Sequence, residues 1–201
     1  MTYVKPGDHV ITCLSAFCGH CEACTTGHPS ICDGRETLCR RDQPARLYQE
    51  ERTVQQFANL SSFAEQMLIH EHALVKIRDD MPRDKAALIG CGVTTGVGAV
   101  HNTVKVEVGL TVTVIGMMPY GTKVEIHAAD FLKEKKLLGC AMGSNRFRVD
   151  MPRYVDFCLA GRLKLDDLLE DHIKLEQVNE AFNASKTGEV ARKVIVFNHL
   201  V

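Results

Sequence analysis

The sequence predicts a mixed α/β fold, and three observations support this prediction. Four cysteines lie within fifteen residues, just after His9–Leu14, a segment that alternates like a strand. Two later segments, Met151–Leu159 and Gln177–Ala184, repeat apolar side chains with the period of an α-helix. Leu110–Ile115 and Lys193–Phe197 are short apolar runs rich in β-branched residues, which is typical of buried strands.

Composition sets the outer limits. Hydrophobic residues make up 45% of the 201 positions, which is enough for an ordinary core. The 24 basic and 25 acidic residues leave a net charge of −1, so there is no basic footprint for nucleic acid or an anionic membrane. No apolar run reaches the length of a membrane span, and the opening residues MTYVKPG are polar and turn-forming, unlike a targeting segment. We therefore expect a soluble, cytoplasmic protein.

The first third of the chain reads as strand and loop. Val4–Asp8 contains Pro-Gly and predicts a turn before the His9–Leu14 strand. Residues 33–57 are polar with clustered charges, which predicts an exposed surface loop. Strand character resumes at Phe63–Ile69 and Ala73–Ile77.

The cysteine run has the order C-x2-C-x2-C-x7-C and predicts a structural metal site. Thiolates this close in sequence can reach one ion, and Gly19 and Gly27 let the backbone fold tightly around it. Four anionic sulfurs favour tetrahedral Zn²⁺ and leave no open coordination position, so the site would stabilise structure and not perform chemistry. The predicted ligands are Cys18, Cys21, Cys24 and Cys32.

Two other interpretations of the run stay open. An iron–sulfur cluster also uses C-x2-C-x2-C, but the ferredoxin pattern continues with three residues and then Cys-Pro, whereas here seven residues intervene and Asp33 follows Cys32. Disulfides would suit an oxidising compartment, but nine cysteines is an odd number and no secretory signal opens the sequence. Zinc is the preferred interpretation.

From Pro82 the pattern becomes helical. Arg83–Ile89 predicts a short helix, and Gly92–Val104 carries small residues that allow close helix packing. Two Gly-x-Gly strings at positions 90–92 and 96–98 lack the third glycine of a dinucleotide-binding fingerprint. We attribute them to close backbone contacts.

The passage Ala87–Ala99, ALIGCGVTTGVGA, resembles the linker into the cofactor domain of zinc-dependent medium-chain alcohol dehydrogenases. In that family a lobe with a four-cysteine zinc loop of this spacing lies upstream, as it does here. Val4–Leu14 is similar to the strand that leads into the loop. The C-terminal third continues the resemblance in four segments: Gly143–Asp156, Ala160–Asp167, Asn179–Phe182 and Thr187–Arg192.

The resemblance implies a GroES-like, β-rich zinc-binding lobe plus the remnant of a doubly wound Rossmann cofactor domain. It assigns residues 1–91 to the lobe, with the zinc loop at 18–32, and 92–143 to a shortened cofactor domain. Residues 144–201 would then form a C-terminal segment that returns to the lobe.

The resemblance also implies an activity and a second site. Members of the family oxidise a small-molecule alcohol to a carbonyl with hydride transfer to NAD(P), and a catalytic Zn²⁺ polarises the alcohol oxygen. Cys91 matches a ligand of that catalytic zinc, and Thr95 matches a residue beside the nicotinamide. Arg192 matches an arginine on the cofactor's pyrophosphate, a role that suits a guanidinium because it can hold phosphate oxygens bidentately.

Parts of the family's pattern are missing from the sequence. A phosphate-binding loop should follow Leu110–Ile115, but Gly116 is followed by MMPYG, which lacks the second glycine and places Pro119 where a helix should begin. Val124–His127 already reads as one of the late strands of the sheet. The family's other catalytic zinc ligands precede the residues that match Val4 onward, which leaves Cys91 as the one recognisable ligand.

These gaps lead to specific expectations. We expect an N-terminally truncated and internally shortened family member that binds one structural zinc and shows little or no dehydrogenase turnover alone. The alternative is a non-catalytic, zinc-stabilised structural or binding remnant. Strands stripped of their sheet partners would expose edges and apolar faces, so we also expect a homo-oligomer or an aggregation-prone chain.

Overall fold

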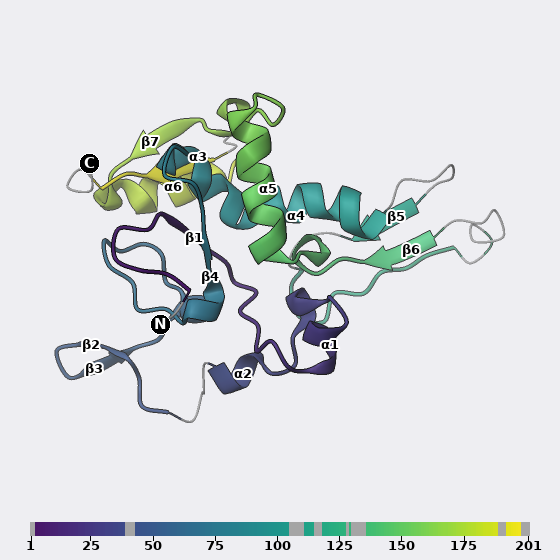
Figure 1. Ribbon diagram of the computed structural model, residues 1–201, viewed down its shortest axis with the longest axis horizontal. Coiled ribbons are helices and arrows are strands. Elements are labelled where there is room, and N and C mark those ends of the chain that lie inside the picture. Colours follow the sequence, from purple (N-terminus) through teal and green to yellow (C-terminus); the bar gives the residue numbers. More distant parts are fainter. Residues whose placement is uncertain are drawn as a thin grey trace.

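The computed structural model describes residues 3–38, 43–104, 111–114, 118–127, 129, 136–188 and 192–197. The strands are β1 (Val10–Thr12), β2 (Leu47–Gln49), β3 (Arg52–Val54), β4 (Leu74–Lys76), β5 (Thr111–Val114), β6 (Lys136–Gly139), β7 (Asp171–Ile173) and β8 (Lys193–Ile195). The α-helices are α1 (Glu22–Thr25), α2 (Arg35–Leu38), α3 (Arg83–Leu88), α4 (Thr94–Gly98), α5 (Phe147–Leu159) and α6 (Val178–Ser185). The fold is mixed α/β, as the sequence predicts (Figure 1).

The strands pair two by two in the described residues. β1, which leads into the cysteine loop, runs antiparallel to β4, with Ile11 opposite Val75. β7 and β8 form a parallel pair. The predicted strand at Phe63–Ile69 is wrong: this stretch is bends and irregular chain. Its Ile69 instead packs against a small buried cluster that includes Ala73, so side-chain burial and not strand pairing fixes the segment.

The main core joins the two ends of the chain. Phe147, Met151 and Val155 on α5 are at most 1% exposed, and they pack with Ile11 of β1 and Val75 of β4. In Figure 1, α5 runs through the middle of the molecule, between β7 and the cysteine loop. The C-terminal segment therefore completes the hydrophobic core of the N-terminal strands.

Residues 83–104 form one continuous helix instead of the two stretches expected. Two π-helical segments, Ile89–Val93 and Ala99–Val104, follow α3 and α4 without a break. The backbone at the junctions Leu88, Val93 and Ala99 stays in the right-handed helical region. The π segments add a residue per turn locally, and such bulges are frequent at functional sites.

The region after this helix differs most from the prediction. β5 lies within the predicted strand Leu110–Ile115, whose end residues fall outside the described part of the chain. It pairs in parallel with β6, with Thr111 opposite Lys136. The predicted strand at Val124–His127 is wrong, because residues 118–127 contain no strand and the Val124 side chain is 57% exposed.

Other predictions from sequence are confirmed or refined. α5 and α6 lie where helical periodicity places them, and Gly161 ends α5 with φ +69° and its N–H bonded to Cys158. The exposed stretch 33–57 contains α2 and a hairpin of β2 and β3 that stands out from the body in Figure 1. No helix among the described residues is both long and apolar enough to span a membrane.

Candidate metal centre

The four cysteines are carried by a loop that folds back on itself directly after β1. Cys18 opens the loop, and Gly19 and Gly27 adopt φ values of +86° and +88°, which confirms that glycines make its two sharp turns. Between these glycines lies α1, which carries Cys24 and begins one residue after Cys21. A 3₁₀ turn at Pro29–Ile31 then brings the chain back.

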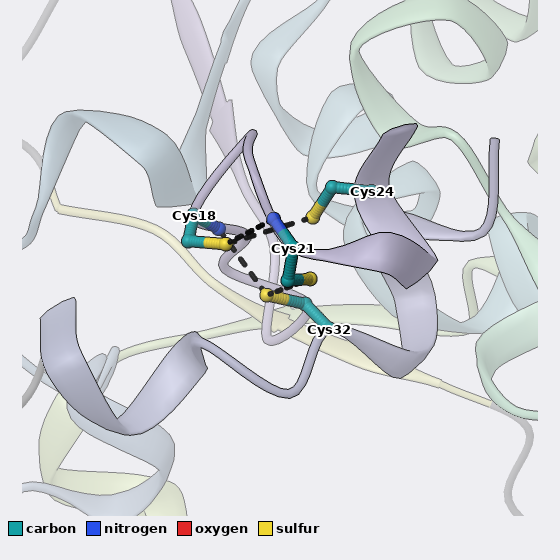
Figure 2. Close-up of side chains that lie close together, drawn as sticks. All are labelled: Cys18, Cys21, Cys24 and Cys32. Atoms are coloured by element: carbon teal, nitrogen blue, oxygen red, sulfur yellow. Dashed lines mark hydrogen bonds between the residues drawn. The ribbon is translucent and has the colours of Figure 1, made fainter. Parts of the chain in front are cut away.

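The four sulfur atoms converge on one point (Figure 2), and all of them lie within 4.8 Å of one another. The Sγ atoms of Cys21 and Cys32 are 3.7 Å apart, and those of Cys18 and Cys24 are 4.0 Å apart. Sulfurs at the corners of a tetrahedron with Zn–S bonds of about 2.3 Å would be separated by about 3.8 Å. The arrangement therefore fits tetrahedral Zn²⁺, and all four thiols are free of disulfides.

Backbone N–H groups point at the sulfurs. The N–H of Cys18 donates to Cys32 Sγ at 3.2 Å, and the N–H of Cys21 donates to Cys18 Sγ at 3.3 Å. Hydrogen bonds from the backbone of Cys24, and also of Gly34 and Asp33, lower the pKa of the Cys21 thiol to about 6. N–H···S bonds of this kind favour the thiolate, which is the form that binds metal.

The pKa of Cys24 moves in the opposite direction. Burial, followed by hydrogen bonds with neighbouring thiols, raises it to about 12. Thiolates this close repel one another, so without a cation they cannot all ionise together. A divalent ion at the centre removes that obstacle, and binding would release protons.

Gly34 was not singled out from the sequence, yet it shapes the site. A β-carbon at this position would lie 2.6 Å from Cys18 Sγ and 2.9 Å from Cys18 Cβ. The chain that leaves the loop can therefore pass beside a predicted ligand only because residue 34 has no side chain. A glycine two residues after the last cysteine was the one signal available in the sequence.

Phe17, directly before Cys18, links the loop to the rest of the molecule. Its ring stacks on His72 at 5.3 Å between centroids and meets Phe147 of α5 edge to face at 5.5 Å. The His72 ring nitrogen Nδ1 lies 2.8 Å from the Phe17 carbonyl oxygen. The C-terminal segment thus supports the start of the loop, a contact that no sequence pattern indicates.

The second predicted site is only partly assembled. Cys91 is exposed, within the first π segment. In the part of the chain that the structure describes, the four-cysteine loop alone brings three or more metal-binding side chains to one point, so Cys91 is not part of a three-ligand group there.

Arg192 lies against Gly92, the residue that follows Cys91. A β-carbon on Gly92 would meet Arg192 Nη2 at 2.8 Å, so the guanidinium packs directly against this glycine. The arginine is otherwise exposed, and its backbone carbonyl accepts a hydrogen bond from Glu170. Arg192 is therefore brought to the segment that carries Cys91, 101 positions away in the sequence, and both residues were singled out by resemblance.

Thr95 and Gly98 pack against the chain before α5. The Thr95 hydroxyl lies 3.7 Å from Met142 Sδ. A β-carbon on Gly98 would clash with the Gly143 carbonyl oxygen and lie 2.9 Å from Gly143 Cα. A β-carbon on Gly90 would lie 3.0 Å from the Thr12 carbonyl oxygen. Close backbone contact accounts for Gly90 and Gly98, as predicted, but Gly92 packs against the Arg192 side chain and Gly96 has open space around it.

Comparison with known proteins agrees with this architecture. The alcohol dehydrogenase GroES-like domain family matches residues 1–79. An alcohol dehydrogenase class-3 from Oryza sativa subsp. japonica is 33% identical over 154 residues, which cover 74% of this chain and 40% of that protein. An S-(hydroxymethyl)glutathione dehydrogenase from Photobacterium damsela subsp. piscicida is 40% identical over 128 residues, 62% of this chain and 35% of the relative.

Solved structures share the fold at lower identity. An alcohol dehydrogenase zinc-binding domain protein from Burkholderia ambifaria superposes with a TM-score of 0.86 at 20% identity, covering 98% of this chain and 79% of the other. Benzyl alcohol dehydrogenase from Acinetobacter calcoaceticus gives 0.79, also at 20% identity, with coverages of 97% and 79%. Fold and cysteine cluster together define a mixed α/β protein with a GroES-like lobe. The chain is thus similar to alcohol dehydrogenases over most of its length, and it spans about two fifths of the length of the first-named curated relative.

Proposed function

We propose that this chain is a zinc-binding lobe of the alcohol dehydrogenase type, in which Cys18, Cys21, Cys24 and Cys32 hold one structural Zn²⁺. The observation that carries the proposal is the convergence of the four sulfurs at tetrahedral spacing, with backbone N–H groups aimed at them. Zinc in this site is coordinatively closed, so it stabilises the loop and takes no part in a reaction.

Metal content per chain tests this proposal. The purified protein is expected to contain one zinc and to be colourless, because Zn²⁺ has a filled d shell. Visible absorption with iron in the preparation would instead indicate the iron–sulfur interpretation. Two zinc ions per chain would mean that further residues complete a second site around Cys91.

We propose that the parent activity is oxidation of an alcohol to a carbonyl with NAD(P), and that this chain alone shows little of it. Catalytic zinc needs three protein ligands and an open position, and among the described residues Cys91 stands without the other two. The β5–β6 pair also has far fewer strands than the six-stranded sheet of a nicotinamide-binding domain, so we interpret it as the remnant of a cofactor domain.

Residual dehydrogenase activity is the second candidate, because Arg192 packs on Gly92 beside Cys91. In this candidate Cys91 would be a ligand of the catalytic zinc, while Thr95 and Arg192 would contact the nicotinamide and the pyrophosphate. The named relatives point to S-(hydroxymethyl)glutathione and simple alcohols as the substrates to try first.

A coupled assay on these alcohols with NAD⁺ and NADP⁺ separates the two candidates. No turnover, and no binding in a nicotinamide cofactor titration, is expected for a non-catalytic zinc-stabilised lobe. Robust turnover by the purified chain, lost in Arg192→Ala, would establish the dehydrogenase instead. Binding without turnover would indicate that the cofactor contacts survive while the catalytic zinc site does not.

A further inference from the structure

Arg35, the first residue of α2, ties together the two ends of the cysteine loop. Its Nη2 donates to the carbonyl of Ser30 at 2.8 Å, and its Nε donates to the carbonyl of Ala16 at 3.3 Å. Ser30 lies two residues before Cys32, and Ala16 lies two residues before Cys18. One guanidinium therefore bridges the chain that enters the loop and the chain that leaves it.

The position of Arg35 is itself fixed from both sides. The preceding Gly34 lies against the Cys18 side chain, where even a β-carbon would be too close. Three residues further on, Leu38 packs against the small buried cluster that contains Ala16. Arg35 is thus held in place by its neighbours and is not a long side chain that happens to reach two carbonyls.

The two cysteines nearest to this bridge are the two buried ones. Cys18 and Cys32 are 6% and 7% exposed, whereas Cys21 and Cys24 are partly exposed. The same two are joined by the hydrogen bond from Cys18 N–H to Cys32 Sγ. Loss of Arg35 would remove the donors from two carbonyls in buried segments and would let these segments move apart.

We propose that Arg35 is a positioning residue for the metal centre, which holds Cys18 and Cys32 at coordination distance by binding Ala16 and Ser30 at once. The inference rests on the proposed zinc site and adds a residue outside the ligand set. A guanidinium suits this task because its donors are fixed in a planar fork, whereas an ammonium is a compact charge on a flexible stem. The partners of metal ligands often change metal affinity by about 10- to 100-fold when lost.

The test measures zinc release from the 201-residue chain to a colorimetric chelator. Arg35→Met removes both the charge and the planar fork of donors, whereas Arg35→Lys keeps the charge but not the fork. Arg52→Met, on the exposed strand β3, is the matched control. We expect Arg35→Met and Arg35→Lys to release zinc at least about tenfold faster than wild type. We expect Arg52→Met to match wild type. The visible spectrum of the Co²⁺-loaded protein should change in both Arg35 variants, a signature that a general loss of stability would not produce.

Each outcome decides the inference. If the wild-type protein binds no zinc, both the proposed metal centre and this inference are wrong. If wild type holds zinc and Arg35→Met releases it at the same rate, the inference alone is overturned. Wild-type behaviour of Arg35→Lys beside fast release from Arg35→Met would show that charge acts and the two hydrogen bonds do not, which also overturns it. If Arg35→Met fails to fold by circular dichroism, the comparison of Arg35→Lys with wild type decides.

Discussion

The four-cysteine loop and the segment around Cys91 differ in how their side chains are brought together. The loop gathers four sulfurs from fifteen consecutive residues, and two glycine turns and one short helix suffice to close it. The Cys91 segment depends on contacts with residues far away in the sequence, Arg192 against Gly92 and Gly143 against Gly98. A site built within one loop can be complete by itself, whereas a site assembled from distant segments needs every one of them.

Loss of a loop ligand should have the largest effect. Cys18→Ser is expected to abolish zinc binding and to lower the free energy of unfolding by several kcal/mol, because structural zinc contributes on the order of 10 kcal/mol in small domains. Cys91→Ser, at an exposed position, should keep one zinc and change stability by less than about 0.5 kcal/mol. Metal analysis and urea unfolding check both variants, and equal losses in the two would erase the contrast between the regions.

Chelation should separate the regions by thiol reactivity. In the zinc-loaded protein, we expect iodoacetamide to modify Cys91 and to leave Cys18, Cys21, Cys24 and Cys32 unmodified, since metal-bound thiolates are protected. After treatment with EDTA, the four loop cysteines should react as well. Mass spectrometry of peptides after a timed reaction gives the answer. Rapid modification of the loop without EDTA would mean that these thiols do not hold a metal.

Glycine packing near Cys91 can be tested with two neighbouring positions of α4. Gly98→Ala should lower the free energy of unfolding by about 1–3 kcal/mol or more, because its β-carbon would clash with Gly143. Gly96→Ala, with open space around it, should raise stability by about 0.5–1 kcal/mol through helix propensity. Thermal unfolding followed by circular dichroism measures both. A neutral Gly98→Ala would refute the close approach of α4 to the chain at Gly143.

The smallest effect is expected from a surface pair that joins α3 to β7. His172 Nε2 lies 3.0 Å from Asp84 Oδ2. Burial of the Asp84 carboxyl acts to raise its pKa, but hydrogen bonds from Lys85 N–H and His172 outweigh this and lower it below the ordinary 3.8. The pair should contribute less than about 1 kcal/mol.

The sign of the pH dependence follows from that lowered pKa. The contribution of Asp84 is present above pH 3.8, its ordinary value, and is lost as the pH falls through the lower pKa of the folded state. The difference in unfolding free energy between wild type and Asp84→Asn should therefore shrink on acidification below that pH. A difference that grew on acidification would contradict the assignment.

Several features could be predicted because their causes are local. The turn at Gly7, the glycine turns of the loop, the capping Gly161 and the period of α5 and α6 each depend on a few adjacent residues. The failures share the opposite property. Phe63–Ile69 and Val124–His127 have strand-like composition, but a strand forms only where another strand offers an edge, and neither stretch is paired in the structure.

The sequence by itself determined that the four cysteines of the loop can converge, and where the later helices α5 and α6 lie, since fifteen residues can meet around one point without help from the rest of the chain. Only the tertiary structure decided that Gly34 must lack a side chain beside Cys18, that Arg35 joins Ala16 to Ser30, and that Arg192 lies on Gly92. These contacts depend on distances of a few ångströms between separately folded segments. Such distances are set by how the core packs, and no pattern within a single segment encodes them.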